Sequence, residues 1–168
     1  MTGSSSNRQV WALAVTTFGL GHMRPASGTW GSLPPPIIAG ALLMAGASHG
    51  VVTGVMVALA IVFSLACLLW GDRAEARWNK KDPGQVVADE TAGQALALLA
   101  IPGGADDPVR LALVLLTAFL AFRVLDIIKP WPAGKLQSIR GGAGILIDDL
   151  IAGLEALVIV QVLWRWVF

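Results

Sequence analysis

Hydrophobic residues in this chain form long runs, separated by short polar or glycine- and proline-rich stretches. The run at 51–70 contains twenty residues without a charge, the length that a helix needs to cross the hydrocarbon core of a bilayer. A second run, at 109–129, is polar only near its ends. Three further stretches, at 34–47, 86–101 and 145–168, predict shorter or more polar helices. The pattern therefore predicts an all-α polytopic membrane bundle of about five membrane helices, some of them short or tilted.

Prolines mark where two of these predicted helices begin and end. The three prolines at 34–36 suit a helix entrance, where the missing backbone N–H is not needed. Pro130 and Pro132 stop the run at 109–129. The length suits one domain, which we assign to 1–168, with the polar start at 1–9 expected to be disordered.

Composition strengthens the membrane prediction. Hydrophobic residues make up 55% of the chain and charged residues 14%, whereas soluble domains average roughly 25% charged. A net charge of +1 gives no reason to expect a nucleic-acid partner. The single cysteine, Cys67, lies in an apolar run and cannot form an internal disulfide. None of these features indicates an oligomeric state.

The basic residues predict how the helices are oriented. If the amino terminus lies in the cytoplasm and five spans alternate, ten lysines and arginines fall on the cytoplasmic side and two on the other side. This asymmetry follows the positive-inside rule. The polar segments that could carry chemistry then share the cytoplasmic face. The cytoplasmic set is Arg8, Arg24, Arg73, Arg77, Lys80, Lys81, Arg123, Lys129, Lys135 and Arg140, against Arg110 and Arg165.

Two adjacent aspartates interrupt the last apolar run. Asp148 and Asp149, in "GGAGILIDDLIAG" (141–153), stand where a lipid-facing helix carries Leu or Val. Carboxylates inside a membrane span are unfavourable unless they face the bundle interior, where they commonly serve function. Glu155 continues the stripe of Asp148 along the helix, and small residues beside the acids allow either close helix approach or room for a ligand. The alternative is that the acids only cap a helix amino terminus.

A second acidic pair and a mixed row of charges lie on the same predicted face. Asp89 and Glu90 stand at the entrance of the helix predicted at 86–101, where the capping alternative applies again. Arg123, Asp126 and Lys129 follow each other at three-residue spacing and share one side of a helix. Arg and Lys in such a row could bind an anion such as phosphate. The alternative is a structural ladder of ion pairs.

Two glycine-rich segments could hold phosphate oxygens. The stretch "SGTWGSLP" (27–34) is interpreted as a loop on the same predicted face, where exposed backbone N–H groups could cradle phosphate oxygens and Thr29 and Ser32 add hydroxyls. The "GGAG" at 141–144, with Gly142, comes just before the last helix, whose amino terminus would favour an anion. The predicted site holds five acids and only two bases, and five ionised carboxylates cannot lie close together without a cation. Carboxylate oxygens with space for phosphate are ligands that suit Mg²⁺. The acids are Asp89, Glu90, Asp126, Asp148 and Asp149, and the bases are Arg123 and Lys129.

Four motifs, in this order and spacing, resemble the phosphatidylglycerophosphatase A family. They are "GTWGSLP" (28–34), "DE" (89–90), "FRVLDIIKPWP" (122–132) and "GGAGILIDDLIAG" (141–153), and the resemblance spans about residues 18–168. It implies a Mg²⁺-dependent enzyme of the bacterial inner membrane. Such an enzyme removes the terminal phosphate of phosphatidylglycerophosphate and yields phosphatidylglycerol, a precursor of cardiolipin. The expected partners are this lipid and membrane lipids.

The resemblance also implies roles for the residues already singled out. Asp89, Glu90, Asp148 and Asp149 are predicted as catalytic, with some subset of them holding Mg²⁺. Six residues are predicted to bind substrate, by gripping the phosphate or orienting the residues that do. Attack by water and a covalent aspartyl-phosphate are both open. The predicted substrate-binding residues are Thr29, Ser32, Arg123, Asp126, Lys129 and Gly142.

Two features of the sequence fit other functions. "RPASG" (24–28) has a superficial likeness to acid-phosphatase-like lipid phosphatases, which need a later pair of histidines, and no histidine follows His49. A small ion transporter could use acids as a cation pathway. A pathway should cross the bilayer, however, and here the acids gather at one face. Another type of lipid-phosphate phosphatase and the transporter therefore stand as the alternatives.

Overall fold

The computed structural model describes residues 5–103, 107–129 and 141–167. Within these ranges every regular element is a helix, which confirms the all-α prediction. The elements are α1 (Ser5–Val15), η1 (Leu20–His22), α2 (Ser27–Ser32), α3 (Pro34–Met44), α4 (His49–Trp78), α5 (Ala88–Ala97), α6 (Pro108–Ile128), α8 (Gly142–Val162) and η2 (Leu163–Val167).

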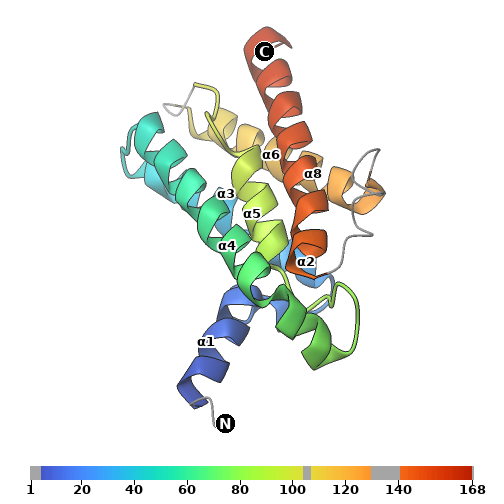
Figure 1. Ribbon diagram of the computed structural model, residues 1–168. Coiled ribbons are helices and arrows are strands. Elements are labelled where there is room, and N and C mark those ends of the chain that lie inside the picture. The colour runs from blue at the N-terminus through green and yellow to red at the C-terminus, as the bar shows by residue number, and fades with distance from the viewer. Residues whose placement is uncertain (1–4, 104–106, 130–140, 168) are drawn as a thin grey trace.

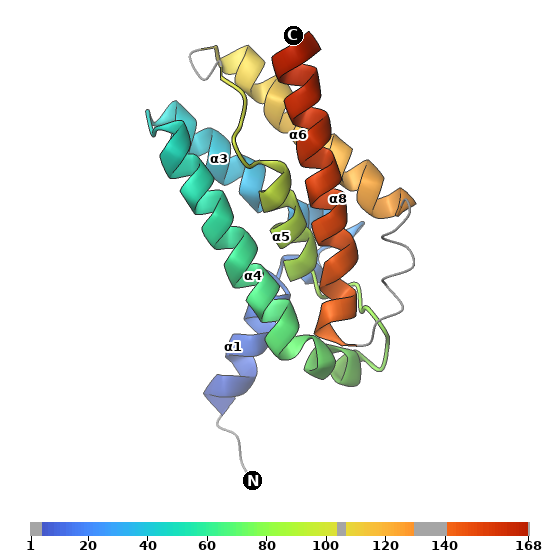
Figure 2. The same ribbon diagram turned by 45° about the horizontal axis from the view of Figure 1, so that its top comes forward.

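The short helix α5 forms the centre of the bundle. In both views it lies between α4 and α8, with α3 and α6 behind it (Figures 1 and 2). Eight of its ten residues are buried. A polar side chain on α5 is therefore enclosed by the longer helices, although α5 itself is only two to three turns long.

Two of the described helices, α4 and α6, are long and apolar enough to cross a membrane. Leucines such as Leu113, Leu116 and Leu120 leave about half of their surface exposed along α6, which suits contact with lipid. The helices α3 and α5 have 11 and 10 residues, fewer than the ~20 that a span needs. The helix α8 has 21 residues but carries three acids. The number of five spans thus stays a prediction.

Several element boundaries differ from those expected. The helix α4 continues two turns beyond Trp70, because the following segment has good helix formers and buries Ala74. It ends at Trp78, and Asn79 caps it in a left-handed conformation. The helix α1 begins at Ser5, inside the stretch expected to be disordered. The segment predicted as a Gly-Ser-Thr loop forms the helix α2, in which the Ser32 hydroxyl donates to the Gly28 carbonyl at 2.7 Å.

The ends of α6 follow the sequence signals closely. Asp107 caps its amino terminus by accepting from the backbone N–H groups of Val109 and Arg110, and Pro108 takes the first helical position. The helix ends at Ile128, and Lys129 caps it in a left-handed conformation (φ 49°). The two prolines predicted to stop this helix lie in 130–140, outside the described residues.

Glycines allow α5 and α8 to touch backbone to backbone. A Cβ atom added to Gly153 of α8 would collide with the carbonyl oxygen of Gly93 and lie 2.9 Å from its carbonyl carbon. A Cβ atom on Gly93 would collide with the carbonyl oxygen of Asp149 and lie 2.6 Å from Phe122. This contact is the close approach that the small residues beside the acids predicted. It brings the acidic ends of α5 and α8 together.

Candidate metal centre and phosphate site

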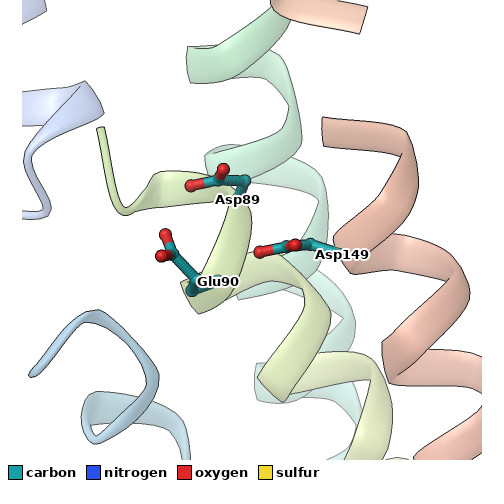
Figure 3. Close-up of side chains that lie close together, drawn as sticks. All are labelled: Asp89, Glu90 and Asp149. Atoms are coloured by element: carbon teal, nitrogen blue, oxygen red, sulfur yellow. The ribbon is translucent and has the colours of Figure 1, made fainter. Parts of the chain in front are cut away.

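Three acidic side chains from two helices meet at the buried start of α5. Asp89 and Glu90 lie in the first turn of α5, and Asp149 reaches them from α8 (Figure 3). Each offers one carboxylate oxygen, and these oxygens all lie within 4.8 Å of one another. The segments that carry them are about sixty residues apart in the sequence. The crossing at Gly93 and Gly153 is what joins them.

The surroundings of these carboxylates favour a bound cation. Asp89 and Asp149 are only 4% and 2% exposed. Asp89 Oδ1, Glu90 Oε2 and Asp149 Oδ2 are buried and have no hydrogen-bond partner within the described part of the chain. Unpaired buried carboxylates are strongly unfavourable, so a bound cation would satisfy them. A set of three carboxylate oxygens fits a hard divalent ion.

Unlike the adjacent Asp149, Asp148 forms an ion pair within the described part of the chain. Its Oδ2 atom forms an ion pair with the Lys129 ammonium group. Successive residues on a helix point about 100° apart, so Asp149 faces α5 while Asp148 faces the end of α6. Of the four acids predicted as metal ligands, the structure brings together three, and it places Asp148 beside the base at the end of α6.

Arg123 connects α6 to the short helix α2. Its Nη1 atom lies 2.7 Å from Asp126 Oδ2 and donates to the Ser32 hydroxyl at 3.4 Å. A Cβ atom on Gly28 would lie 3.0 Å from Nη1 of Arg123 and would collide with Glu90 Oε1. The backbone of α2 therefore packs directly on the arginine and on one acid of the cluster, and a larger residue at position 28 would displace the ends of these two side chains.

The two bases of the site pair with acids outside the cluster, so the negative charge of the three clustered acids is not balanced by a salt bridge among the described residues. Arg123 pairs with Asp126 within α6, as the ion-pair alternative predicted. Lys129 instead pairs with Asp148 of α8. Among the described residues, Asp89, Glu90 and Asp149 make no salt bridge. The predicted need for a cation therefore falls on these three acids.

Two threonines that sequence reasoning missed hold this region together. The Thr91 hydroxyl lies 2.8 Å from the carbonyl oxygens of both Gly31 and Val87, and 3.0 Å from the Thr17 hydroxyl. Both threonines are buried. They join the end of α1, the helix α2 and the start of α5. The only signal in the sequence was the position of Thr91 directly after the acidic pair.

Two further polar residues near the site were also missed. Gln94 is fully buried one turn after Glu90, and neither atom of its amide has a hydrogen-bond partner in the described ranges. Its signal was a single polar residue inside "GQALALLA". Asp82, before α5, lies close enough to Lys129 and Asp148 to interact with both. Burial raises the pKa of the Asp82 carboxyl, and the positive charge of Lys129 acts in the opposite direction.

The remaining predicted residues lie at the border of the site. Thr29 is half-buried in α2, and its backbone N–H donates to the Ala26 carbonyl at 2.9 Å. Gly142 is buried against α4, where an added Cβ atom would collide with the carbonyl oxygen of Cys67. This contact gives Gly142 a role in helix packing. Substrate binding by Thr29 and Gly142 stays a prediction.

Comparison with known proteins places the chain in a family. The model of the family described as phosphatidylglycerophosphatase A matches residues 13–164. The "Phosphatidylglycerophosphatase A" of Haemophilus influenzae is 34% identical over 159 residues, covering 92% of this chain and 88% of that protein. That of Escherichia coli K12 is 39% identical over 74 residues, covering 44% of this chain and 40% of that protein.

A third relative has a different name. The "Putative phosphatidylinositol-3-phosphatase" of Bacteroides thetaiotaomicron is 34% identical over 155 residues, covering 92% of this chain and 93% of that protein. No solved structure matches the chain. The family match extends from the end of α1 to the end of α8 and includes every residue of the acid cluster. The chain belongs to the phosphatidylglycerophosphatase A family.

Proposed function

We propose that this chain is a Mg²⁺-dependent phosphatase that hydrolyses phosphatidylglycerophosphate to phosphatidylglycerol and inorganic phosphate. Family membership and the named relative in Haemophilus influenzae support the activity. The observation that carries the metal dependence is the meeting of Asp89, Glu90 and Asp149 with unpartnered, buried carboxylate oxygens. Arg123 lies beside the cluster, with Gly28 packed between it and Glu90.

The side chains of the site divide into two groups in this proposal. Asp89, Glu90 and Asp149 would hold the ion. When bound, Mg²⁺ neutralises charge on the phosphate oxygens and makes a water molecule more acidic. Arg123, oriented by Asp126 and Ser32, presents its guanidinium group to the phosphate. Lys129, held by Asp148, supplies a second positive charge.

The nucleophile is a separate question within the same proposal. Water attack leaves no covalent trace on the protein, whereas a covalent route would place phosphate on an aspartate. Trapping a phosphorylated aspartate after a rapid quench would favour the covalent route and contradict direct attack by water.

We further propose that the protein is a multi-pass protein of the bacterial inner membrane with its site at the cytoplasmic face. The apolar helices α4 and α6 support membrane insertion. The distribution of ten basic residues against two supports the orientation. A lipid substrate can then keep its acyl chains in the bilayer while its phosphate reaches the acid cluster.

Thiol labelling tests this orientation. Gly103 and Lys81 are exposed and lie on opposite sides in the proposed topology, and Cys67 is buried. In spheroplasts, a membrane-impermeant maleimide should label Gly103→Cys and should label Lys81→Cys only after the membrane is permeabilised. Labelling of Lys81→Cys in intact spheroplasts, with Gly103→Cys protected, would reverse the orientation. Gly103 is preferable to Asp107 here, because Asp107 caps α6.

A second lipid phosphate is a candidate substrate because of the relative in Bacteroides thetaiotaomicron. Phosphatidylinositol 3-phosphate and phosphatidylglycerophosphate share a phosphomonoester on a head group that is joined to diacylglycerol by a phosphodiester. The acid cluster and Arg123 would engage the phosphomonoester that both lipids carry. The head group next to it would then decide between the two substrates.

Phosphate release from purified protein in detergent–lipid micelles tests the function. We expect Mg²⁺-dependent release from phosphatidylglycerophosphate, abolished by a chelator, at a rate at least about tenfold above that from phosphatidylinositol 3-phosphate. A preference for the inositol lipid would transfer the assignment to the second candidate. Absence of release from both lipids, combined with cation flux in liposomes, would favour the transporter instead.

A further inference from the structure

An apolar groove runs between α3 and α6, outside the acid cluster. It has a volume of about 550 Å³, and all the residues that line it are apolar. Gly40 forms part of its floor, where an added Cβ atom would lie 3.0 Å from Leu115 Cδ1. Ile37 and Met44, on its α3 side, are 62% and 76% exposed. The groove is therefore open and has no polar group to bind a head group.

Both walls of the groove lead to the phosphate-binding residues. On the α3 side, the groove begins at Leu33, which directly follows Ser32. On the α6 side, its last residue is Phe119, one helical turn before Arg123. Arg123 donates to the Ser32 hydroxyl at 3.4 Å, so the two walls meet at this hydrogen bond. An occupant of the groove would have one end beside Arg123.

We propose that this groove holds one acyl chain of the lipid substrate while the phosphate of the same molecule lies at the acid cluster. The inference rests on the proposed function, because it needs a lipid phosphate as substrate. Its support is the continuity between the all-apolar groove and Arg123, which contacts both Ser32 of α2 and Asp126. A molecule with a hydrocarbon tail and an anionic end matches both parts.

Binding of an acyl chain in the groove should raise the rate of turnover more than it raises the affinity for the lipid. Hydrocarbon in the bilayer is as apolar as the groove, so moving an acyl chain between them yields little hydrophobic free energy. A chain held between α3 and α6 does restrict where the phosphate lies. Small errors in the position of a reacting group can lower a rate by about a hundredfold, and a held chain would reduce such errors.

A tryptophan placed in the groove tests the proposal. Ala41 lines the groove and is exposed, so Ala41→Trp fills space without entering the core. It lies eight residues beyond Leu33 along α3, about 12 Å at the helical rise, so a six-carbon chain would end before it. Ala58→Trp, on an exposed side of α4, is the matched control. The rates to compare are those on dioleoyl and dihexanoyl phosphatidylglycerophosphate in the same micelles.

We expect Ala41→Trp to lower the ratio of the dioleoyl rate to the dihexanoyl rate about tenfold, and Ala58→Trp to leave it unchanged. An unchanged ratio in Ala41→Trp would overturn the proposal. An equal loss of rate on both lipids, together with a change in the mass of the protein–detergent particle measured by light scattering, would indicate that a second copy of the chain occupies the groove. That result would also overturn the proposal.

Photocrosslinking provides a readout that does not depend on turnover. Dioleoyl-type phosphatidylglycerophosphate with a diazirine near the end of one acyl chain should crosslink to groove residues such as Met44 in the wild-type protein. Equal labelling of the exposed face of α4 would overturn the proposal. If the wild-type protein crosslinks at the groove but releases no phosphate from either lipid, the proposed function fails, and the groove is shown to bind a lipid acyl chain that does not belong to a substrate.

Discussion

Replacing Asp149 with asparagine is expected to abolish Mg²⁺-dependent phosphate release. Asp149 is the member of the cluster that α8 contributes, and its Oδ2 atom is buried without a partner within the described ranges. Loss of a metal ligand should remove about 4 kcal/mol of transition-state stabilisation, which is about a thousandfold in rate. Phosphate release and Mg²⁺ binding by titration calorimetry in detergent are the measurements.

Asp148→Asn is the matched control, because it makes the same chemical change at the adjacent residue. Asp148 pairs with Lys129 and lies outside the cluster. We expect this variant to keep Mg²⁺ affinity within about threefold and to lose about tenfold in rate, since Lys129 would be held less firmly. Equal loss of Mg²⁺ binding in both variants would contradict the three-acid site and restore the original four-acid prediction.

Thermal unfolding separates a lost metal site from a lost fold. Three buried carboxylates repel each other when no cation is bound. Removing one charge should therefore leave the midpoint of unfolding of metal-free Asp149→Asn at or above that of the metal-free wild-type protein. A lower midpoint would mean that Asp149 stabilises the fold by another contact, and the loss of activity would then not identify a metal ligand.

Replacing Gly153 with valine is expected to have the largest effect on folding. The added side chain would meet the backbone of Gly93, and backbone atoms cannot move aside as the end of a flexible side chain can. Overpacking of a tight core typically costs about 1–3 kcal/mol or more. At the upper end this corresponds to a midpoint of unfolding lower by roughly 6–12 °C. The measurement is thermal unfolding in detergent.

Gly54→Val is the control for this substitution. Gly54 lies within α4, and an added Cβ atom there meets nothing within 4 Å. We expect this variant to unfold within about 3 °C of the wild-type protein, since valine has a somewhat higher helix propensity than glycine. A Gly153→Val protein that unfolds as late as Gly54→Val would show that α5 and α8 can separate without loss of the fold.

The identities of most site residues could be predicted from the sequence because they are chemically out of place. Acids and bases inside apolar runs stand out against a hydrocarbon background, so Asp89, Glu90, Asp149 and Arg123 could all be named as candidates, and the structure brings them close together. Gln94 and Thr91 were missed because an amide or hydroxyl in a helix is common and carries no charge. The sequence could not separate Asp148 from Asp149, because adjacent residues look equivalent in a linear pattern, whereas the structure places only Asp149 with Asp89 and Glu90.

The sequence by itself determined the helical class, the two long apolar helices and the ends of α6, because hydrophobic run length, proline and a capping aspartate act locally. Only the tertiary structure decided which charges meet. The rotation of about 100° per residue turns Asp149 toward α5 and Asp148 toward Lys129. The contact between Gly93 and Gly153 sets the distance between the two acidic helix ends. Both depend on how α5 and α8 cross, which no local pattern encodes.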